Sequence, residues 1–489
     1  MTIQLASDLN GSPVLLRQPW RECVGSGHAV LALRADWQAQ MRQARAELGF
    51  RHVRFHGLLS DDMGTLVCEN DQLLYSFFNT DQIFDFLRTL EMYPIVELSF
   101  MPAALASGGA TVFQYRANIT PPRDLAQWGE LMRRLAAHWV ERYGIDEVAQ
   151  WYFEVWNEPN LPAFWSGGQQ AYFDLYECTV RAIKGVDARL RVGGPATAQN
   201  AWLPEFLAFC QQRGLPVDFL STHYYPTDAF GQIGADTDTQ LEHAPLGVMR
   251  ERAQAAREQA QGRPLLYTEW NITSNPRDPL HDSSFGAALA LRIALSVDDL
   301  VDAYSYWVVS DIFSENYFPS VPFHGGFGLF NLHGIKKPVY SAFEMLVALG
   351  ECHYPPEPPQ SHPTVQLWVG EPLGDGLLSR VLCINQAMPR HAIAAEDIAL
   401  RVRPRPGLRV RRVSLSRIDE QHANPRQLWQ QMGEPEYLSA AQVDALRQAA
   451  TPLLEELQLP PQDNAEQALL AFSVAPQSVN LLSIEWERA

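Results

Sequence analysis

Eight short apolar segments, each followed by a longer amphipathic segment, constrain the fold of this chain more than any other feature. The apolar segments are predicted strands at residues 20–25, 52–57, 94–99, 152–157, 191–194, 218–223, 264–269 and 303–307. Helical periodicity follows, and several helices open with Asp, a good N-cap residue (36–48, 81–90, 124–143, 172–186 and 243–259). This repeated alternation predicts an α/β fold, the (β/α)8 TIM barrel. A doubly wound open sheet is the alternative, but neither a GxGxxG nor a Walker-type glycine loop is present.

The texture of the sequence changes at a proline-rich stretch, residues 355–359. Beyond it lie strand-like segments at 365–369, 377–384, 408–416 and 479–486, with one helical segment near 440–457. We therefore expect a barrel over residues 16–350 and a mainly β, sandwich-like accessory domain over residues 351–489. Residues 1–15 are too few for a unit of their own and are expected to add to the β domain.

Composition and charge exclude several classes of function. The formal net charge of −18 disfavours nucleic acid and anionic membranes as partners. No apolar run is long enough to predict a membrane span, and the first residues lack the basic start and apolar core of a signal peptide. The six cysteines are scattered without a CxxC pair, so reduced thiols are expected. Together these features predict a cytoplasmic location.

Two predicted strands finish in a carboxylate side chain. Glu158 follows the fourth strand, and on a continuing strand Glu154, Trp156 and Glu158 would share one face. Glu269 ends the seventh strand, which faces the fourth across the mouth of an eight-stranded barrel. Glycoside hydrolysis generally requires two such carboxyl groups. Retention needs them about 5–5.5 Å apart and inversion roughly 6.5–9.5 Å, a distance that the sequence does not fix.

Other polar and aromatic side chains fall at the same strand ends. Asn157 precedes Glu158 and is suited to hold a sugar 2-hydroxyl, whereas Trp307 can form an apolar floor under a pyranose. Further candidates for a sugar pocket are His56, His223 and Tyr225. For each histidine, the alternative is a hydrogen-bonded imidazole in the core.

Neither a metal nor a cofactor is predicted. His56, His223 and His324 could meet in space, but the sequence has neither HxH nor HExxH spacing around them. Glycoside hydrolysis needs no cofactor, because carboxyl groups supply both the nucleophile and the protons.

The two carboxylate motifs, residues 157–159 and 268–270, resemble those of clan A glycoside hydrolases. Longer stretches resemble glycoside hydrolase family 39, and within it the β-xylosidases rather than the α-L-iduronidases (54–57, 60–62, 112–113, 118–122, 153–161, 310–313, 323–329, and again 418–425 and 432–437). The resemblance implies a retaining, exo-acting β-D-xylosidase that releases xylose from the non-reducing end of short xylo-oligosaccharides. It implies Glu158 as acid/base and Glu269 as nucleophile. It also implies sugar contacts from His56, Phe113, Asn157, His223, Trp307 and Glu315.

Two alternatives stay open at this point. One is a glycosidase of related specificity, acting on a uronide or an arabinoside; a uronide would require a cation near the sugar, and Arg54 is the one basic residue beside a predicted active strand end. The other is a catalytically inactive sugar-binding barrel, which normally loses one of the two carboxylates. Oligomeric state, aglycone preference and the role of the β domain are not determined by the sequence.

Overall fold

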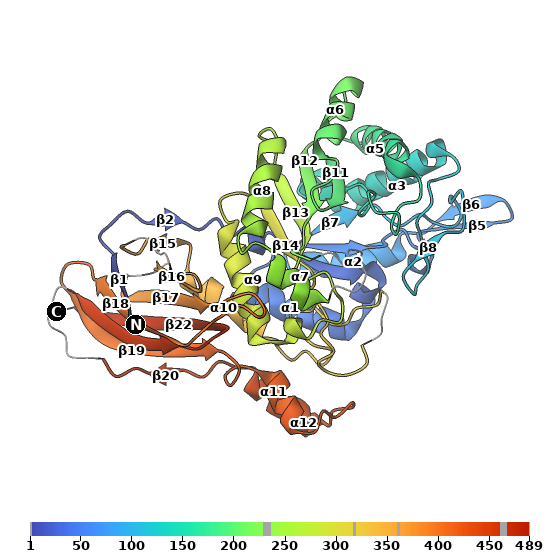
Figure 1. Cartoon of the computed structure of the whole chain (residues 1–489). Helices are drawn as coiled ribbons and strands as arrows, with labels where there is room; N and C mark the ends of the chain where they lie inside the picture. Colours follow the sequence, from blue (N-terminus) through green and yellow to red (C-terminus); the bar gives the residue numbers. More distant parts are fainter. Residues whose placement is uncertain are drawn as a thin grey trace.

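A closed barrel of eight parallel strands forms the larger part of the molecule (Figure 1). The computed structural model describes residues 2–227, 236–315, 319–358, 362–372, 374, 376–459 and 467–488, so Pro359 of the proline-rich stretch lies outside the described residues. The barrel strands are β3 (Cys23–His28), β4 (His52–His56), β7 (Tyr93–Glu97), β10 (Tyr152–Glu154), β11 (Arg191–Ala198), β12 (Phe219–His223), β13 (Leu265–Trp270) and β14 (Ala303–Tyr306). The (β/α)8 prediction is therefore confirmed.

Helices cover the outside of the barrel. They are α1 (Ala35–Leu48), α2 (Phe78–Thr89), α3 (Leu125–Tyr143), α5 (Gly168–Lys184), α6 (Leu203–Arg213), α8 (Val248–Gln259), α9 (Ser284–Ser296) and α10 (Pro338–Leu349). Asp124 caps α3, since its carboxylate accepts a hydrogen bond from the Ala126 N–H at 2.8 Å. The same prediction is wrong for Asp36 and Asp81, which lie inside the first turns of α1 and α2. The Asp36 carboxylate pairs with Arg34 and accepts from the Trp37 N–H at 2.9 Å, and the Asp81 carboxylate pairs with His138.

β10 is shorter than predicted, and this changes which side chains share a face. The ladder ends at Glu154, and the left-handed φ angles of Trp156 (72°) and Glu158 (43°) take the chain out of the pleat. Trp156 turns into the core, where its indole N–H donates to the Phe164 carbonyl at 2.9 Å. The prediction that Glu154, Trp156 and Glu158 share one face is therefore wrong. Glu154 stays inside the barrel, and Glu158 reaches the mouth.

A β sandwich packs beside the barrel (Figure 1). Its smaller sheet has the order β1 (Ile3–Asp8), β18 (Glu396–Arg403), β21 (Ala468–Val474). The larger sheet has the order β2 (Val14–Leu15), β15 (Cys352–Tyr354), β16 (Val365–Gly370), β17 (Leu378–Asn385), β22 (Ser478–Arg488), β19 (Leu408–Ile418), β20 (Glu455–Glu456). Both sheets contribute to one core, with Leu400 and Leu470 from the first and Leu367 and Leu482 from the second. The N-terminal strand β1 pairs in parallel with β18.

Two short helices connect the sandwich to the barrel loops. α11 (Pro425–Gln431) and α12 (Ala440–Ala449) lie at the lower edge of the molecule in Figure 1. Trp429 and Leu446 from these helices pack with Phe323 of the loop after β14. The predicted helix at 440–457 ends early, because Pro452 follows it and β20 pairs with β19.

The remaining described elements are short. They are the hairpins β5 (Leu66–Glu69)–β6 (Gln72–Tyr75) and β8 (Thr111–Val112)–β9 (Ala117–Asn118), the helices α4 (Ile145–Val148) and α7 (Thr237–His243), and four 3-10 turns. Within the described ranges, none of the helices has both the length and the apolar character needed to span a bilayer.

Candidate active site

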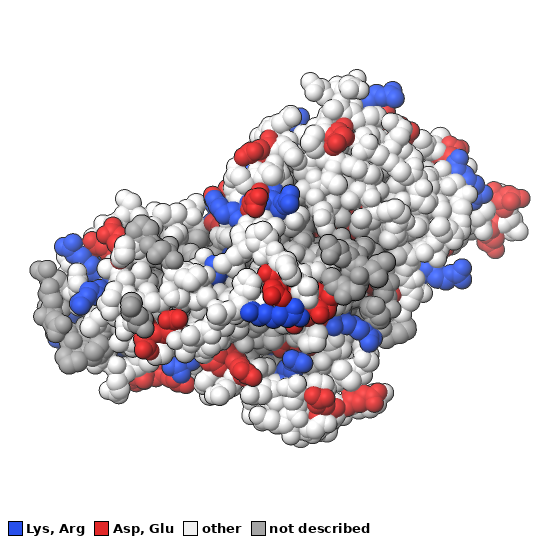
Figure 2. All heavy atoms as spheres, in the orientation of Figure 1, with Lys and Arg blue, Asp and Glu red and all other residues white. Residues whose placement is uncertain are grey.

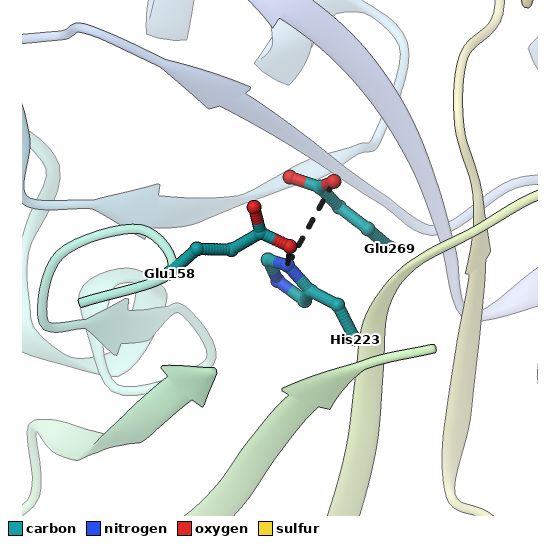
Figure 3. Close-up of side chains that lie close together, drawn as sticks. All are labelled: Glu158, His223 and Glu269. Carbon is teal, nitrogen blue, oxygen red and sulfur yellow. Dashed lines mark hydrogen bonds and ion pairs between the residues drawn. The ribbon is translucent and has the colours of Figure 1, made fainter. Parts of the chain in front are cut away.

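Glu158 and Glu269 meet at the mouth of the barrel, each 8% exposed or less (Figure 3). Glu269 lies in β13, the seventh barrel strand, and Glu158 follows β10, the fourth. One carboxylate oxygen of each residue and one ring nitrogen of His223 all lie within 4.8 Å of one another. Oxygens this close agree with the separation of about 5–5.5 Å between carboxyl groups that is typical of retaining glycosidases, rather than with the roughly 6.5–9.5 Å of inverting ones.

The hydrogen-bond donors around Glu269 favour its charged form. Arg54 Nη1 donates to Oε1 at 2.7 Å, and the Tyr225 hydroxyl donates to Oε2 at 3.0 Å. Burial raises the pKa of Glu269 above its ordinary value, while Arg54 and His56 oppose that rise. Because hydrogen bonds donated to a carboxylate stabilise its charged state, Glu269 is set up to be ionised.

The surroundings of Glu158 favour its neutral form. Burial, and then the nearby negative charge of Glu269, raise the pKa of Glu158 well above its ordinary value. Its described hydrogen-bond partner is His223, with 3.0 Å between Oε1 and Nδ1. Two neighbouring carboxyl groups whose environments differ in this way have the pattern of a general acid beside an ionised partner.

Arg54 holds the acidic groups of the site together. Its fully buried guanidinium contacts four partners, Glu97, Glu154, Glu269 and the Asn157 side-chain oxygen. Glu97 also bonds His56 at 2.7 Å, and although burial works to raise the pKa of Glu97, Arg54 and His56 hold it below its ordinary value. This network fixes both the nucleophile candidate and the residue that precedes Glu158.

Aromatic rings form one wall of the cavity. The rings of His56 and Trp307 are 4.7 Å apart, and His56 and Phe113 are stacked at 6.2 Å. Gly25 allows the indole to lie against β3, because a Cβ there would stand 2.3 Å from the Trp307 ring. The resulting apolar face is the kind of surface on which sugar rings rest.

Glu315 lies beside these rings and, unlike Glu97, has surroundings that favour its protonated form. Burial, offset by His56 and reinforced by Glu269, raises the pKa of Glu315 to about 8. Its Oε1 is buried without a hydrogen-bond partner and lies 3.6 Å from His56 Nε2. A neutral carboxyl group in this position has hydrogen-bonding capacity left for a hydroxylated ligand.

The predicted site residues converge on one cavity of about 540 Å³. Those that line it are His56, Phe113, Asn157, Glu158, Tyr225, Glu269, Trp307 and Glu315. His223 does not line the cavity but lies behind Glu158, fully buried. His324 is not among the lining residues either; its ring bonds the Val321 carbonyl.

Sequence reasoning missed two groups of residues. Glu97 and Glu154 support the site from inside the barrel. The sequence could have indicated them, because a charged residue within an apolar strand needs a buried partner. The polar rim of the cavity had no such signal in the sequence, since it comes from the connections that follow the barrel strands, including the short helix α7 (Gln199, Thr227, Asp236, Thr237, Gln240, Ser274 and Asn275).

Within the described residues, one group has donor atoms close enough together to surround a cation, namely Glu158, His223 and Glu269. Both oxygens of Glu269 already accept hydrogen bonds from Arg54 and Tyr225, and Glu158 is bonded to His223. We therefore interpret these three residues as an acid–base group that binds and releases protons, and we assign no metal to it.

A (β/α)8 barrel with two buried carboxyl groups at the ends of its fourth and seventh strands defines a glycoside hydrolase. The chain belongs to glycosyl hydrolase family 39, whose sequence profile matches residues 1–463. It is 44% identical over 470 residues to the β-xylosidase of Caldicellulosiruptor saccharolyticus, which covers 95% of each chain. It is 36% identical over 493 residues to the β-xylosidase of Geobacillus stearothermophilus, with 96% of this chain and 94% of that one covered.

A solved structure agrees with this assignment. The crystal structure of the GH39 enzyme from Xanthomonas axonopodis pv. citri superposes with a TM-score of 0.85 at 34% identity, covering 99% of this chain and 98% of that one. The family resemblance read from the sequence is thus confirmed.

Proposed function

We propose that the protein is a retaining, exo-acting β-D-xylosidase that removes xylose from the non-reducing end of short xylo-oligosaccharides. The observation that carries retention is the short distance between the two carboxyl groups, one oxygen of each lying within 4.8 Å of the other. The proposed substrate follows from the similarity to two β-xylosidases. Glu269 attacks the anomeric carbon while Glu158 protonates the departing oxygen. A water molecule, deprotonated by Glu158, then hydrolyses the xylosyl-enzyme.

The other predicted residues bind the sugar in this proposal. Trp307 and Phe113 provide the apolar surface, and Asn157, held by Arg54, is placed for a hydroxyl next to the anomeric carbon. His56 and Glu315 offer polar atoms to the hydroxyls farther from the reacting bond. Tyr225 orients Glu269, and His223 acts on Glu158.

A neutral sugar fits the charge of the cavity better than a uronic acid. Among the described residues that line the cavity there is no Lys or Arg, whereas Glu158, Glu269, Glu315 and Asp236 are acidic. Arg54, the cation that a uronide would need, is fully buried and already bound to three carboxylates. A substrate carboxylate would enter an acidic cavity without a partner, which costs free energy.

A substrate panel tests this proposal directly. We expect hydrolysis of nitrophenyl β-D-xyloside to exceed that of the matching α-L-arabinosides and α-L-iduronide, and proton NMR to show β-xylose as the first product. Preference for the uronide would favour the iduronidase alternative, and α-xylose as the first product would rule out retention. Calorimetric binding of xylose without turnover of any glycoside would favour a sugar-binding barrel.

The pKa shifts predict a bell-shaped dependence of kcat/KM on pH. Activity needs Glu269 ionised, so it falls as pH drops through the pKa of Glu269. Activity also needs Glu158 protonated, so it falls as pH rises through the high pKa of Glu158. With an activated phenolic leaving group, Glu158→Gln is expected to remove the alkaline limb, measured by stopped assays across pH. Retention of that limb would take the acid role away from Glu158.

Domain boundaries, cellular location and partners are also proposed. We place the catalytic barrel at residues 16–350 and the accessory domain at 351–489, and the pairing of β1 with β18 supports adding residues 1–15 to the latter. We also propose a cytoplasmic role in xylan degradation, in keeping with six cysteines that are all free thiols. Nucleic acid and membranes are not proposed as partners, because the basic side chains in Figure 2 are interspersed with acidic ones.

A further inference from the structure

A line of buried side chains connects the Arg54 network to Glu158. It runs through Glu154, Thr268 and His223, all fully buried. The Thr268 hydroxyl donates to Glu154 Oε1 at 2.7 Å. His223 Nε2 lies 3.1 Å from the same hydroxyl oxygen, and His223 Nδ1 lies 3.0 Å from Glu158 Oε1. Figure 3 shows the imidazole directly behind the Glu158 carboxyl group.

The direction of each hydrogen bond can be deduced from the Glu154 end. Glu154 is ion-paired with Arg54, so its carboxylate can only accept. Thr268 has a single hydroxyl proton, and that proton is committed to Glu154. The hydroxyl oxygen must therefore accept from His223, which places a proton on His223 Nε2.

The other nitrogen of His223 then carries a lone pair. Burial, together with the positive charges of Arg54 and His56, lowers the pKa of His223 well below its ordinary value, so the ring is neutral. A neutral imidazole has only one N–H, and here it is at Nε2. We infer that His223 Nδ1 accepts a hydrogen bond from the Glu158 carboxyl group, and that Thr268 is a positioning residue that keeps this catalytic acid protonated by fixing the His223 tautomer. The inference rests on the acid role proposed for Glu158.

Other charged groups also act on Glu158. Besides His223 they include Glu269, Arg54, Glu315 and Glu97. Glu269 Oε2 also faces His223 Nδ1, at 3.7 Å, which is longer than the 3.0 Å between Nδ1 and Glu158 Oε1 and too long for a hydrogen bond. None of these four groups is hydrogen-bonded to the Thr268 hydroxyl among the described contacts. Removing that hydroxyl therefore changes the tautomer of His223 while leaving the surrounding charges in place.

The arrangement favours one half of the reaction. In the first step the proton leaves Glu158 for the departing oxygen, and in the second Glu158 regains a proton from the attacking water. A bare Nδ1 stabilises the protonated carboxyl group, whereas an N–H at Nδ1 would stabilise the carboxylate. The observed chain thus favours the return of the proton to Glu158 in the second step. In the first step it acts by keeping Glu158 protonated at higher pH, which matters most for a sugar leaving group of high pKa.

Thr268→Val tests this inference. The variant keeps the shape of the side chain but removes the acceptor, so His223 can place its proton on Nδ1 and donate to Glu158. We expect the alkaline limb of kcat/KM to move down by about one pH unit, the size of a switched hydrogen bond. Above that pH, xylobiose hydrolysis should fall about tenfold, whereas a dinitrophenyl xyloside should be little affected.

Two variants serve as controls. Thr268→Ser retains the hydroxyl and should restore the wild-type pH profile. Thr273→Val removes another buried threonine hydroxyl bonded to an imidazole, that of His281 at 3.1 Å, which is not bonded to either carboxyl group. It should leave the alkaline limb in place. An unshifted limb in Thr268→Val, or an equal shift in Thr273→Val, would overturn the inference.

The tautomer can also be observed without turnover. In protein labelled with ¹⁵N-histidine, with His223→Gln used to assign the signal, wild-type His223 should show a bare Nδ1 and a protonated Nε2. A protonated Nδ1 in the wild type would overturn the inference even if Thr268→Val failed to fold. Failure of the wild type to cleave any xyloside would instead refute the proposed function, so the two failures are distinguishable.

Discussion

Glu269→Ala is expected to lower kcat/KM for an aryl β-D-xyloside by on the order of 10⁴-fold or more, the scale of removing a group that acts within a catalytic unit. The reason is that Glu269 is the nucleophile in the proposed mechanism, held by Arg54 at 2.7 Å and Tyr225 at 3.0 Å. Initial rates of nitrophenol release, wild type beside variant, measure the loss.

Azide should rescue this variant in a way that reports the stereochemistry. The truncated side chain leaves room for a small anion on the face of the sugar that Glu269 had attacked, while Glu158 remains to assist departure. Because a single displacement inverts the β-xyloside, the product should be α-xylosyl azide, identified by NMR. Glu315→Ala is the matched control, since it removes another buried carboxyl group of the same cavity. Azide rescue of Glu315→Ala, or none for Glu269→Ala, would remove Glu269 from the nucleophile role.

The position of Glu269 could be predicted from the sequence because it belongs to a regular element. The apolar run of β13 is buried along its whole length, so both its strand character and the carboxylate within it are visible locally. The same reasoning placed Glu158 after the fourth strand, and the ordinals four and seven followed from counting strands.

The local backbone at Glu158 could not be predicted in this way. Strand propensity extends through Val155 and Trp156, yet the ladder stops at Glu154. Trp156 leaves the pleat because its ring finds a place among Trp128 and Trp165 in the core. Such packing depends on residues outside the strand, in α3 and in the loop after β10, so tertiary contacts override the local preference.

The hydrogen-bonded chain behind Glu158 could not be predicted from the sequence either, for a different reason. His223 and Glu158 are 65 residues apart, and Thr268 and Glu154 are 114 apart. Each residue has an ordinary alternative role in a barrel core. Only the closed barrel, which brings the inward-facing side chains of β10, β12 and β13 together, reveals that they form one line.

Arg54→Met is expected to destabilise the protein by about 3–5 kcal/mol at neutral pH, the cost of leaving buried charges without their partner. Arg54 is fully buried, and its loss would leave the carboxylates of Glu97, Glu154 and Glu269 inside the barrel without their cationic partner. The control is Arg250→Met, because Arg250 pairs with Asp299 at the surface, with its side chain 47% exposed. A surface pair contributes about 0–1 kcal/mol. Denaturant unfolding followed by circular dichroism measures both variants.

The effect of Arg54→Met should depend on pH in a defined direction. In the wild type Arg54 helps to hold the pKa of Glu97 below its ordinary value, so the stability that Glu97 contributes is present above the ordinary Glu range and is lost on acidification. The gap between wild type and Arg54→Met should therefore be widest near neutrality and narrow below about pH 4. Loss of the Arg54 bond to Glu269 should also raise the pKa of Glu269 and move the acid limb of kcat/KM upward. We propose that Arg54 stabilises the ionised form of the buried Glu269 carboxyl group. A stability change no larger than that of Arg250→Met, together with an acid limb that does not move, would contradict this role.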